Sequence, residues 1–555
     1  MVLEKITAHE FIDMIRLGSH RLEKNAQFVN SLNVFPVPDG DTGTNMNLTF
    51  QSGYKAVNEA DTKHVGELGQ VLAKGLLMGA RGNSGVITSQ IFRGFSKSIE
   101  QKDSLTPKDL VQAFASGVQT AYQTVMKPVE GTILTVARGA SEAAQAVIDQ
   151  ATSIEQVMQA IVQGAKVALA TTPDLLPVLK EVGVVDSGGQ GLVFIYEGFL
   201  QAVGGSVTDD QAYQPDAQEM DEMLNAAHHQ SVQTQFSNDD IANGFCTEIM
   251  VNLGEQPTSD ERFDYETFQH TLSEIGDSLL VVADEDVVKV HVHTQRPQQV
   301  FTYGRKFGSL AKIKIDNMRI QHETIIENDE PKVVAEPIDY AVIAVVSGIG
   351  LEKLYQSLGV TTVISGGQTM NPSTNDIVEA IKNSNAKRAI ILPNNGNIVM
   401  SAKQACKVVK IPTVIVPSKS IAQGMTALLS FDENTDLETN QQMMTEALAT
   451  VKSGQITHAV RDSEVGTLKI KKDDLIGIVD GEIVINGDDV VQVSLAMCQV
   501  MQDEDSEVVT ILVGAQGNQE TARQISQAIV NDNSELEVEI HQGDQPVYPY
   551  LIAVE

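Results

Sequence analysis

Cysteine and basic residues are both scarce in this chain of 555 residues. The three cysteines, Cys246, Cys406 and Cys498, are widely separated and odd in number. The sequence therefore predicts no disulfide framework and favours a reducing compartment. Only 39 Lys and Arg oppose 73 Asp and Glu, which gives a net charge of -34. Such a charge repels phosphate backbones, so we expect neither nucleic acid nor an acidic membrane surface as a partner.

Long apolar runs are absent as well. No stretch approaches ~18 uninterrupted apolar residues, so the sequence predicts no transmembrane helix. The first twenty residues carry charges throughout and lack the apolar core of a signal peptide. We therefore expect a cytoplasmic protein that does not insert into membranes. Because domains usually contain ~100–200 residues, a chain of this length predicts three or four structural units.

Changes in composition divide the chain into four parts. Residues 1–205 place apolar side chains at helical spacing, which predicts an all-α domain. Residues 206–240 are acidic and contain no Lys or Arg, so we interpret them as a linker. Residues 241–330 predict an α+β domain, and residues 338–555 predict an α/β domain.

Short strand patterns support the last two assignments. In the middle part, residues 279–282 and 287–293 flank a turn and predict a hairpin, after a strand at 245–253. In the C-terminal part, short Val and Ile runs alternate with helical patterns, which predicts a parallel sheet. These runs lie at 341–346, 360–364, 389–392 and 412–416. Residues 467–486 predict antiparallel strands that turn at Asp480-Gly481.

Two aspartates separated by one glycine give the strongest chemical signal. Asp39 and Asp41 follow two prolines, and carboxylates this close repel each other unless a cation lies between them. Oxygen ligands of this kind suit Mg²⁺, which usually shares its ligand shell with phosphates. After Thr42, Gly43 allows close backbone approach, and Thr44-Asn45-Met46 can open a helix whose N-terminus faces anions. The same residues also make a good turn, so a turn without metal remains an alternative.

A glycine-rich loop at residues 79–85 is a second candidate for phosphate binding. It contains Arg81, followed by Gly82, Asn83, Ser84 and Gly85. Glycines let backbone N–H groups surround phosphate oxygens, and a serine adds a donor. No Gly-Lys-Ser/Thr follows, so this is not a Walker A motif. A helix–helix connection with glycine caps explains the same pattern.

Two further segments have a similar composition. Residues 130–135 combine a carboxylate with two hydroxyls, one of them Thr132, although a capped helix start would look the same. Residues 186–191 offer Asp186, Gly188 and two more glycines before a helical pattern. Both are candidate nucleotide contacts, and the second is equally compatible with a tight turn between helices.

Together these segments resemble the ATP-binding L-type domain of the dihydroxyacetone-kinase family over roughly residues 8–205. The match rests on residues 39–46, 82–85, 130–132 and 186–188. The layout of the whole chain, with Asn33-Val-Phe-Pro-Val-Pro before the acidic pair, resembles the A subunit of fatty-acid kinases.

This resemblance implies an eight-helix antiparallel barrel that binds ATP at one end. Two Mg²⁺ would be held by Asp39, Asp41 and their neighbours, and residues 42–45 and 82–85 would hold phosphates. The family pattern has a third acidic residue five positions before the first aspartate. Here that position is Val34, and the adjacent Asn33 is the candidate replacement.

The implied reaction transfers the γ-phosphoryl group of ATP to a fatty-acid carboxylate. A separate fatty-acid-binding protein would present the acid, and the product would be an acyl phosphate for phospholipid synthesis. A carboxylate with a pKa of ~4–5 is already an anion, so no general base is needed. Arg81 and Arg138 are the candidate catalytic cations, although both could be ordinary surface arginines. The alternatives are a kinase for dihydroxyacetone or another small hydroxylated substrate, and a nucleotide-gated scaffold for acyl carriers without chemistry.

The middle part contains a candidate zinc set. His291 and His293 are two residues apart on a predicted strand, and Cys246 lies on another. Ordinary strand and core positions explain the same residues, but the resemblance implies a structural Zn²⁺ in this region and a homodimer formed through it. The C-terminal part has glycine-rich loops after its strands, where ligands often bind. The resemblance implies that this part docks the acyl-binding partner, and we favour docking over lipid binding.

Overall fold

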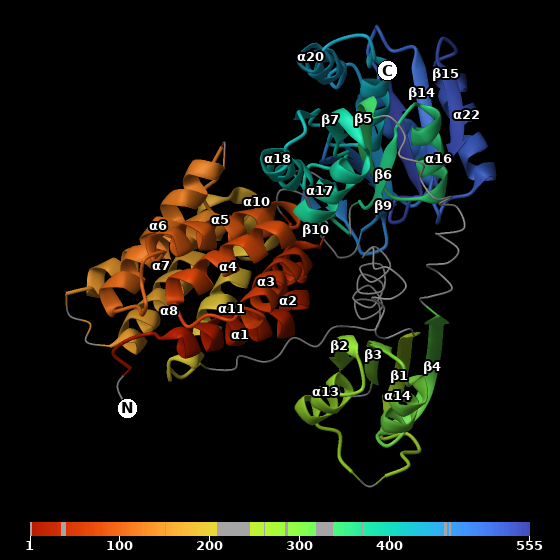
Figure 1. Ribbon diagram of the computed structural model, residues 1–555. Coiled ribbons are helices and arrows are strands. Elements are labelled where there is room, and N and C mark those ends of the chain that lie inside the picture. Colours follow the sequence, from red (N-terminus) through yellow and green to blue (C-terminus); the bar gives the residue numbers. More distant parts are fainter. Residues whose placement is uncertain are drawn as a thin grey trace. The chain divides into compact units, whose positions relative to one another are not determined.

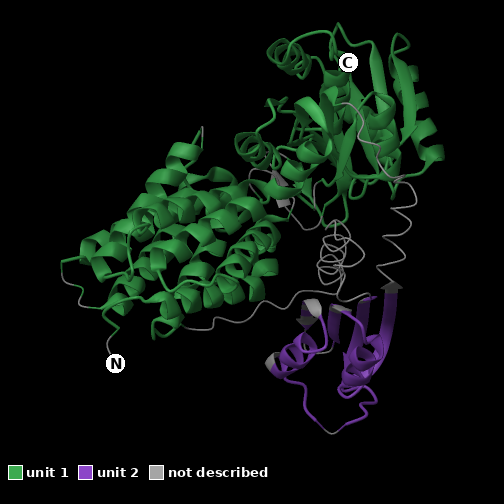
Figure 2. Ribbon diagram, in the orientation of Figure 1, with its two compact units in different colours: residues 1–209, 337–555 green, residues 210–336 purple. Residues whose placement is uncertain are grey.

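The computed structural model describes residues 3–34, 40–125, 127–149, 151, 153–207, 245–259, 261–283, 287–317, 337–367, 370–459, 463–465 and 468–555. The chain forms two compact units (Figure 2). Unit 1 comprises residues 1–209 and 337–555, and unit 2 comprises residues 210–336. Within unit 1 we call residues 3–207 the helical half and residues 337–555 the α/β half. The expected linker at 206–240 lies almost wholly outside the described residues.

The helical half consists of α-helices and their connections (Figure 1). Its helices are α1 (Ala8–Lys24), α2 (Ala26–Ser31), α3 (Thr42–Asn58), α4 (Val65–Gly79), α5 (Gly82–Ser98), α6 (Pro107–Thr124), α7 (Ile133–Val147), α8 (Ile154–Ala170), α9 (Thr172–Leu175), α10 (Pro177–Val182) and α11 (Ser187–Ala202). Among the described residues, eight of these helices are 15 to 18 residues long. The eight contact one another in a closed order, α1-α3-α4-α5-α6-α7-α8-α11 and back to α1. The expectation of a helical N-terminal region is confirmed.

Helical spacing of apolar residues explains why these helices pack. The largest buried side chains of α1 share one face: Phe11, Met14, Ile15 and Leu22. Aromatic rings from separate helices then meet in the centre. The ring of Phe92 on α5 lies 5.3 Å from that of Phe50 on α3 and 5.9 Å from that of Phe199 on α11, in edge-to-face contacts.

The α/β half contains two large sheets. The first is fully parallel, in the order β6-β5-β7-β8, as the sequence predicts. Its strands are β5 (Ile338–Val346), β6 (Thr362–Ser365), β7 (Ala386–Leu392) and β8 (Thr413–Ile415). Successive residues of β5 enter different cores, because helices cover both faces of the sheet. One face packs on α17 (Thr374–Asn383) and α18 (Val399–Val408), and the other on α16 (Ile349–Ser357), α19 (Ile421–Leu429) and α20 (Leu437–Ala447).

The second sheet of this half is mixed, in the order β13-β12-β9-β16-β14-β15. Its strands are β9 (Lys452–His458), β12 (Leu475–Val479), β13 (Glu482–Gly487), β14 (Val508–Val513), β15 (Glu537–Gln542) and β16 (Tyr550–Val554). Helices α21 (Val490–Met501) and α22 (Gln519–Asp532) pack against it, and a small ladder joins β10 (Ser463–Val465) to β11 (Leu468–Ile470). The expected turn is confirmed, since Asp480 and Gly481 have φ of 49° and 95° between antiparallel β12 and β13.

Unit 2 has one antiparallel sheet in the order β2-β3-β1-β4. Its elements are β1 (Phe245–Leu253), α13 (Tyr265–Ser273), β2 (Asp277–Ala283), β3 (Val287–Thr294), α14 (Pro297–Gly304) and β4 (Gly308–Asn317). The expected strand at 245–253 and the expected hairpin are confirmed. The sequence did not reveal β4, on which Ile313 and Ile315 are exposed.

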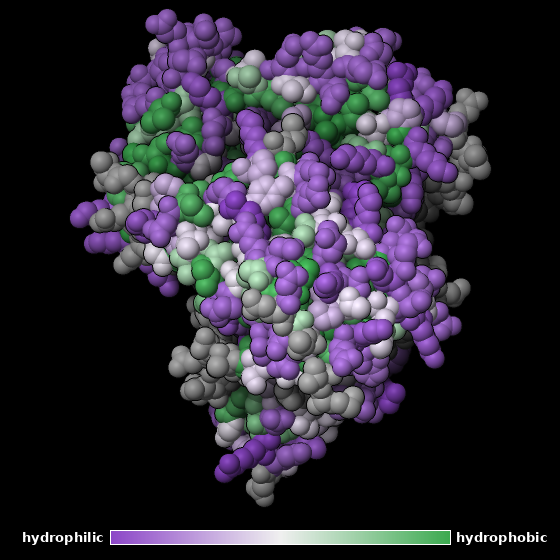
Figure 3. Space-filling view, turned by 90° about the vertical axis from the view of Figure 1, so that its left-hand side faces the viewer, coloured by the Kyte–Doolittle hydropathy of each residue, from purple (hydrophilic) through white to green (hydrophobic). Residues whose placement is uncertain are grey.

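The surface reflects the large number of acidic residues in the chain. The face shown in Figure 3 is largely hydrophilic, with apolar residues in separate patches. None of the helices in the described ranges is long and apolar enough to cross a membrane.

Candidate phosphate-binding site

Each of the four segments singled out in the sequence lies where a long helix begins. Asp41 precedes α3, Arg81 precedes α5, Thr132 precedes α7 and Asp186 precedes α11. The first N–H groups of a helix have no partner within the helix, and the helix dipole makes this end positive. The backbone at all four helix starts therefore favours an anion, which at the start of α11 is the side chain of Asp186 itself.

The starts of α3 and α5 touch each other. Ser84 Oγ on α5 donates to the carbonyl oxygen of Thr42 on α3, at 3.5 Å. Gly82 has φ of +58°, and a Cβ there would lie 2.6 Å from Asn45 Nδ2. The backbone angle thus favours glycine at this contact, and any larger residue would have to displace the Asn45 side chain. The contact brings two helix N-termini together, which is an arrangement suited to binding phosphates.

The starts of α7 and α11 meet through a buried carboxylate. Asp186 Oδ2 accepts a hydrogen bond of 2.6 Å from the N–H of Gly189, and the N–H of Ile133 on α7 also donates to this side chain. Burial raises the pKa of Asp186 to about 7, against the effect of these hydrogen bonds. The side chain therefore joins two helices. Nucleotide contacts at Asp186 and Gly188 stay predictions.

The start of α11 in turn approaches the start of α3. A Cβ at Gly191 would lie 2.7 Å from the sulfur of Met46 in α3. Together with the α3–α5 and α7–α11 contacts, this close approach places the four helix starts at one end of the helical half.

Arg138 is paired close to its own helix start. Its Nη2 donates to Glu130 Oε2 at 2.7 Å, and the arginine side chain is 44% exposed. Thr135 and Tyr122 also donate to this carboxylate. Burial alone would raise the pKa of Glu130, but these hydrogen bonds and the charge of Arg138 lower it. The hydroxyl of Thr132 donates to a backbone carbonyl three residues before it, at 2.7 Å.

The acidic pair is described only in part. Asp39 lies outside the described residues, whereas Asp41 is buried next to the start of α3. The two residues discussed as additional ligand positions, Asn33 and Val34, are also buried.

Asn30 fixes the first turn of α3. Its Oδ1 accepts from the N–H of Thr44 at 3.1 Å, and its Nδ2 donates to the Thr44 hydroxyl at 2.9 Å. Nothing in the sequence pattern singled out Asn30, because a lone asparagine on a short helix carries no signal of its own.

The loop after β6 reaches this site from the α/β half, which the sequence did not predict. Asn371 in this loop donates from Nδ2 to Asp41 Oδ2. Arg81 Nη1 donates to the carbonyl of Asn371 at 2.8 Å and lies 3.5 Å from a carboxylate oxygen of Asp376. Burial lowers the pKa of Arg81, and the charge of Asp376 opposes this effect. Arg81, one of the two candidate catalytic arginines, is therefore engaged by the α/β half.

A second loop of the α/β half makes a similar contact. Asn397, in the loop after β7, accepts a hydrogen bond of 3.1 Å from Nδ2 of Asn83. The loops after β6 and β7, the two strands that flank β5 in the parallel sheet, thus both touch the glycine-rich loop at residues 79–85.

The candidate zinc residues are placed only by their backbone. Cys246 on β1 is the register partner of His293 on β3, and His291 pairs with Glu248 two positions along. Their side chains lie outside the described part of the structure. Within that part, no group of three or more His, Cys, Asp or Glu is arranged to hold a metal.

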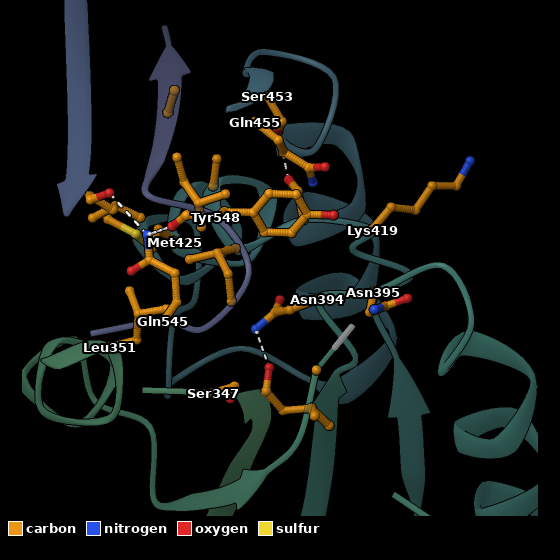
Figure 4. Close-up of a pocket in the computed structure, with 18 of the residues that line it drawn as sticks. Ser347, Leu351, Asn394, Asn395, Lys419, Met425, Ser453, Gln455, Gln545 and Tyr548 are labelled. Atoms are coloured by element: carbon orange, nitrogen blue, oxygen red, sulfur yellow. Dashed lines mark hydrogen bonds between the residues drawn. The ribbon is translucent and has the colours of Figure 1, made fainter. Parts of the chain in front are cut away.

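A separate pocket lies in the α/β half (Figure 4). Ser347, Asn394 and Lys419 follow strands of the parallel sheet, and Gln545 and Tyr548 come from the segment before β16. Lys419 extends away from the other labelled side chains (Figure 4). The cavity measures about 80 Å³, which is room for several waters.

Comparisons with known proteins cover nearly the whole chain. A DAK2 domain matches residues 36–201. The middle and C-terminal domains of the fatty acid kinase FakA-like family match residues 242–325 and 341–555. Protein YloV of Bacillus subtilis is 46% identical over 562 residues, covering 100% of both chains.

Two solved structures resemble parts of the chain. The Fak B3 protein of Streptococcus pneumoniae, solved with linoleic acid, is 12% identical over 39% of this chain and 99% of its own, with a TM-score of 0.28. The dihydroxyacetone kinase of C. freundii, solved with AMP-PNP and Mg²⁺, is 17% identical over 34% of this chain and 33% of its own, also with a TM-score of 0.28.

Proposed function

The chain belongs to the fatty acid kinase FakA-like family, and we propose that it transfers the γ-phosphoryl group of ATP to the carboxylate of a fatty acid. A separate fatty-acid-binding protein presents the acid, and the acyl phosphate feeds phospholipid synthesis. The observation that carries this proposal is the meeting of the α3 and α5 N-termini beside the buried Asp41. The DAK2 match supports a kinase, and the FakA-like matches support a fatty acid as its substrate.

In this proposal residues 1–205 are the kinase domain, and its helix starts bind the phosphates of ATP. The domain is the eight-helix barrel of the resemblance, and the closed contact order of its long helices supports that geometry. Residues 42–45 and 82–85 hold the phosphates through backbone N–H groups other than those of Thr44, Asn45 and Gly85, which are bonded to Asn30, Asp41 and Arg81. Neighbouring contacts to the nucleotide come from the other two helix starts: Thr132, Asp186 and Gly188.

The acidic residues hold magnesium. Asp39, Asp41 and the amide of Asn33 are the residues that would bind Mg²⁺, which supplies positive charge between the phosphates and the incoming carboxylate. A buried carboxylate beside two helix N-termini fits such a cation, because Asp41 would otherwise stand next to phosphate oxygens of the same charge.

The fatty-acid carboxylate needs positioning rather than proton removal. It is already an anion, so this chain contributes by aligning two anions and excluding water. Arg81 and Arg138 are the proposed cations. In this structure Arg81 is bound to the α/β half and Arg138 to Glu130, so each must exchange a partner to reach a phosphate. Unchanged turnover of the Arg81→Ala or Arg138→Ala variant would remove that arginine from catalysis.

The C-terminal domain, residues 338–555, docks the acyl-binding partner in this proposal. The match of the FakA-like C-terminal domain to residues 341–555 is what supports this role.

The middle domain, residues 241–330, carries the proposed homodimer contact and a structural Zn²⁺ bound by Cys246, His291 and His293. The backbone pairing of Cys246 with His293 supports this set. Metal analysis checks it, because the Cys246→Ser variant should lose bound zinc. A native chain that is purified without zinc, and that binds none when zinc is added, would refute the site.

The function itself is tested by direct product detection. The full chain, ATP and Mg²⁺ are mixed with an acyl-binding protein loaded with oleate, and acyl phosphate is trapped as its hydroxamate. We expect product with the native chain and none with Asp41→Ala. Dihydroxyacetone replaces the loaded protein in a parallel reaction. Phosphorylation of dihydroxyacetone alone, or ATP binding without any product, would overturn the proposal in favour of a small-substrate kinase or a scaffold.

A further inference from the structure

The α/β half holds its β6 loop firmly against the glycine-rich loop. The N–H of Thr374 donates to the carbonyl of Ala80 at 3.1 Å, and the guanidinium of Arg81 binds the Asn371 carbonyl at 2.8 Å. Arg81 is itself held by Asp376 in the same segment. These contacts fix the position of Asn371, and its side chain reaches Asp41 as a consequence.

The side chain of Asn371 has an unused acceptor in a buried place. The residue is 2% exposed, its Nδ2 donates to Asp41, and the same nitrogen lies 3.5 Å from Asn45 Oδ1. Its Oδ1 is buried and has no hydrogen-bond partner among the described residues. Nearly all buried polar atoms in proteins are paired, so the orphaned oxygen indicates that this amide pairs fully only when a ligand binds beside it.

The chemistry of an amide suits a cation at this place. An amide oxygen is a normal ligand for Mg²⁺ and related cations. In the helical half, the buried Val34 occupies the position discussed above for an additional acidic ligand, and its side chain offers no oxygen. Because an amide carries its oxygen and nitrogen at equivalent positions, half a turn about its last bond exchanges them. That rotation directs Oδ1 of Asn371 to the side of Asp41.

We propose that Asn371 is an oxygen ligand of the metal and phosphate site, so that the site is complete only with the α/β half in place. This inference rests on the proposed binding of a divalent cation at Asp41, and it adds a residue that lies 330 positions away in the chain. Without the cation, Asn371 donates to the carboxylate as seen here. With the cation, the amide oxygen faces it instead.

The test measures metal affinity in the full chain. Free Mn²⁺ is followed by electron paramagnetic resonance during titration in the presence of AMP-PNP, without any acyl acceptor. Asn371→Ala should weaken Mn²⁺ binding by about tenfold or more, as for other residues that support a metal. Asn371→Asp should bind Mn²⁺ as tightly as the native chain or more tightly. Asn397→Ala, the same change in the neighbouring contact, is the matched control and should stay within about twofold.

Two results would overturn the proposal. Unchanged Mn²⁺ affinity in Asn371→Ala would show that the oxygen is not used. Equal weakening in Asn371→Ala and Asn371→Asp would show that the amide acts only as a donor that latches the two halves together, since aspartate cannot donate to Asp41.

The aspartate variant keeps the test decisive if the alanine variant does not fold. Two carboxylates at Asp41 and position 371 repel each other without metal, so Mn²⁺ should raise the melting temperature of Asn371→Asp more than that of the native chain. An equal or smaller rise would count against a ligand role. Failure of the fatty-acid reaction would leave these metal measurements intact, so the two proposals fail separately.

Discussion

Replacing Asp186 by asparagine should change how the stability of the helical half depends on pH. Burial raises the pKa of this carboxyl to about 7, whereas its ordinary value is 3.8. A carboxyl whose pKa is higher in the folded state binds its proton more tightly there. Its contribution to stability is therefore greatest below pH 3.8 and is lost progressively as the pH rises to about 7. Asparagine cannot titrate, so the variant lacks this loss.

The size of the effect follows from the same two pKa values. Each pH unit between the two pKa values lowers the free energy of unfolding by about 1.4 kcal/mol. The native chain should therefore lose roughly 2–3 kcal/mol of stability relative to the variant between pH 5 and pH 8. For a region of about 200 residues this corresponds to roughly 5–10 °C in melting temperature. The amide also changes the hydrogen bonds to Gly189 and Ile133, but that change is the same at every pH.

The assay is thermal unfolding of both full-length chains at several pH values, followed by far-ultraviolet circular dichroism. The difference in melting temperature, variant minus native, should rise between pH 5 and pH 8 and then level off. Parallel curves would refute the reasoning. They would mean that the N–H groups of Gly189 and Ile133 stabilise the ionised carboxylate enough to cancel the effect of burial.

Two further experiments test the packing. Gly43→Ala should destabilise the helical half by about 3 kcal/mol or more, because its Cβ would lie 1.9 Å from the carbonyl oxygen of Ala26. Thermal unfolding measures the effect, and Gly396→Ala is the control because nothing lies within 4 Å of its Cβ. Equal stability of the two variants would contradict the prediction. Burial raises the pKa of Cys406 to about 11 and of Cys498 to about 12, so both thiols should resist iodoacetamide at pH ~7.5 until the chain is unfolded. Mass spectrometry of the labelled peptides checks this, and rapid labelling of native Cys498 would show the reasoning to be wrong.

Much of the fold follows from local patterns in the sequence. The Val and Ile runs of the parallel sheet are continuous because helices bury both faces, and that alone identified its four strands. The Asp480-Gly481 turn was readable because both residues tolerate positive φ. By contrast, β4 was missed although Lys312 and Lys314 alternate with exposed isoleucines, which is the period-two pattern of a strand.

The residues of the candidate site likewise divide into those that the sequence reveals and those that it does not. Glycines and aspartates that precede helices are visible in the sequence, because helix starts have their own residue preferences. The contact of Asn371 with Asp41 joins positions 330 residues apart, and no periodicity records it. Asn30 was equally invisible, since its function is to hold one turn of α3. The sequence therefore reveals the loops that are proposed to bind phosphates, but not the residues that contact them from elsewhere in the chain.

The charge of the chain bears on how this site can attract a nucleotide. Each helix N-terminus acts as about half a positive charge, so the starts of α3 and α5 together offer about one, against roughly four negative charges on ATP. The nearby cation, Arg81, is already engaged by Asp376 and the Asn371 carbonyl. With a net charge of -34 on the chain, we expect most of the remaining attraction to come from divalent metal.

We therefore expect ATP affinity to fall by about 100-fold or more when Mg²⁺ is replaced by EDTA, as measured by calorimetry at fixed ionic strength. The Asp41→Ala variant should show a much smaller difference between the two conditions, because it lacks a proposed ligand of the metal. Equal affinity of the native chain with and without metal would mean that backbone N–H groups suffice, and the metal role of Asp41 would be untenable.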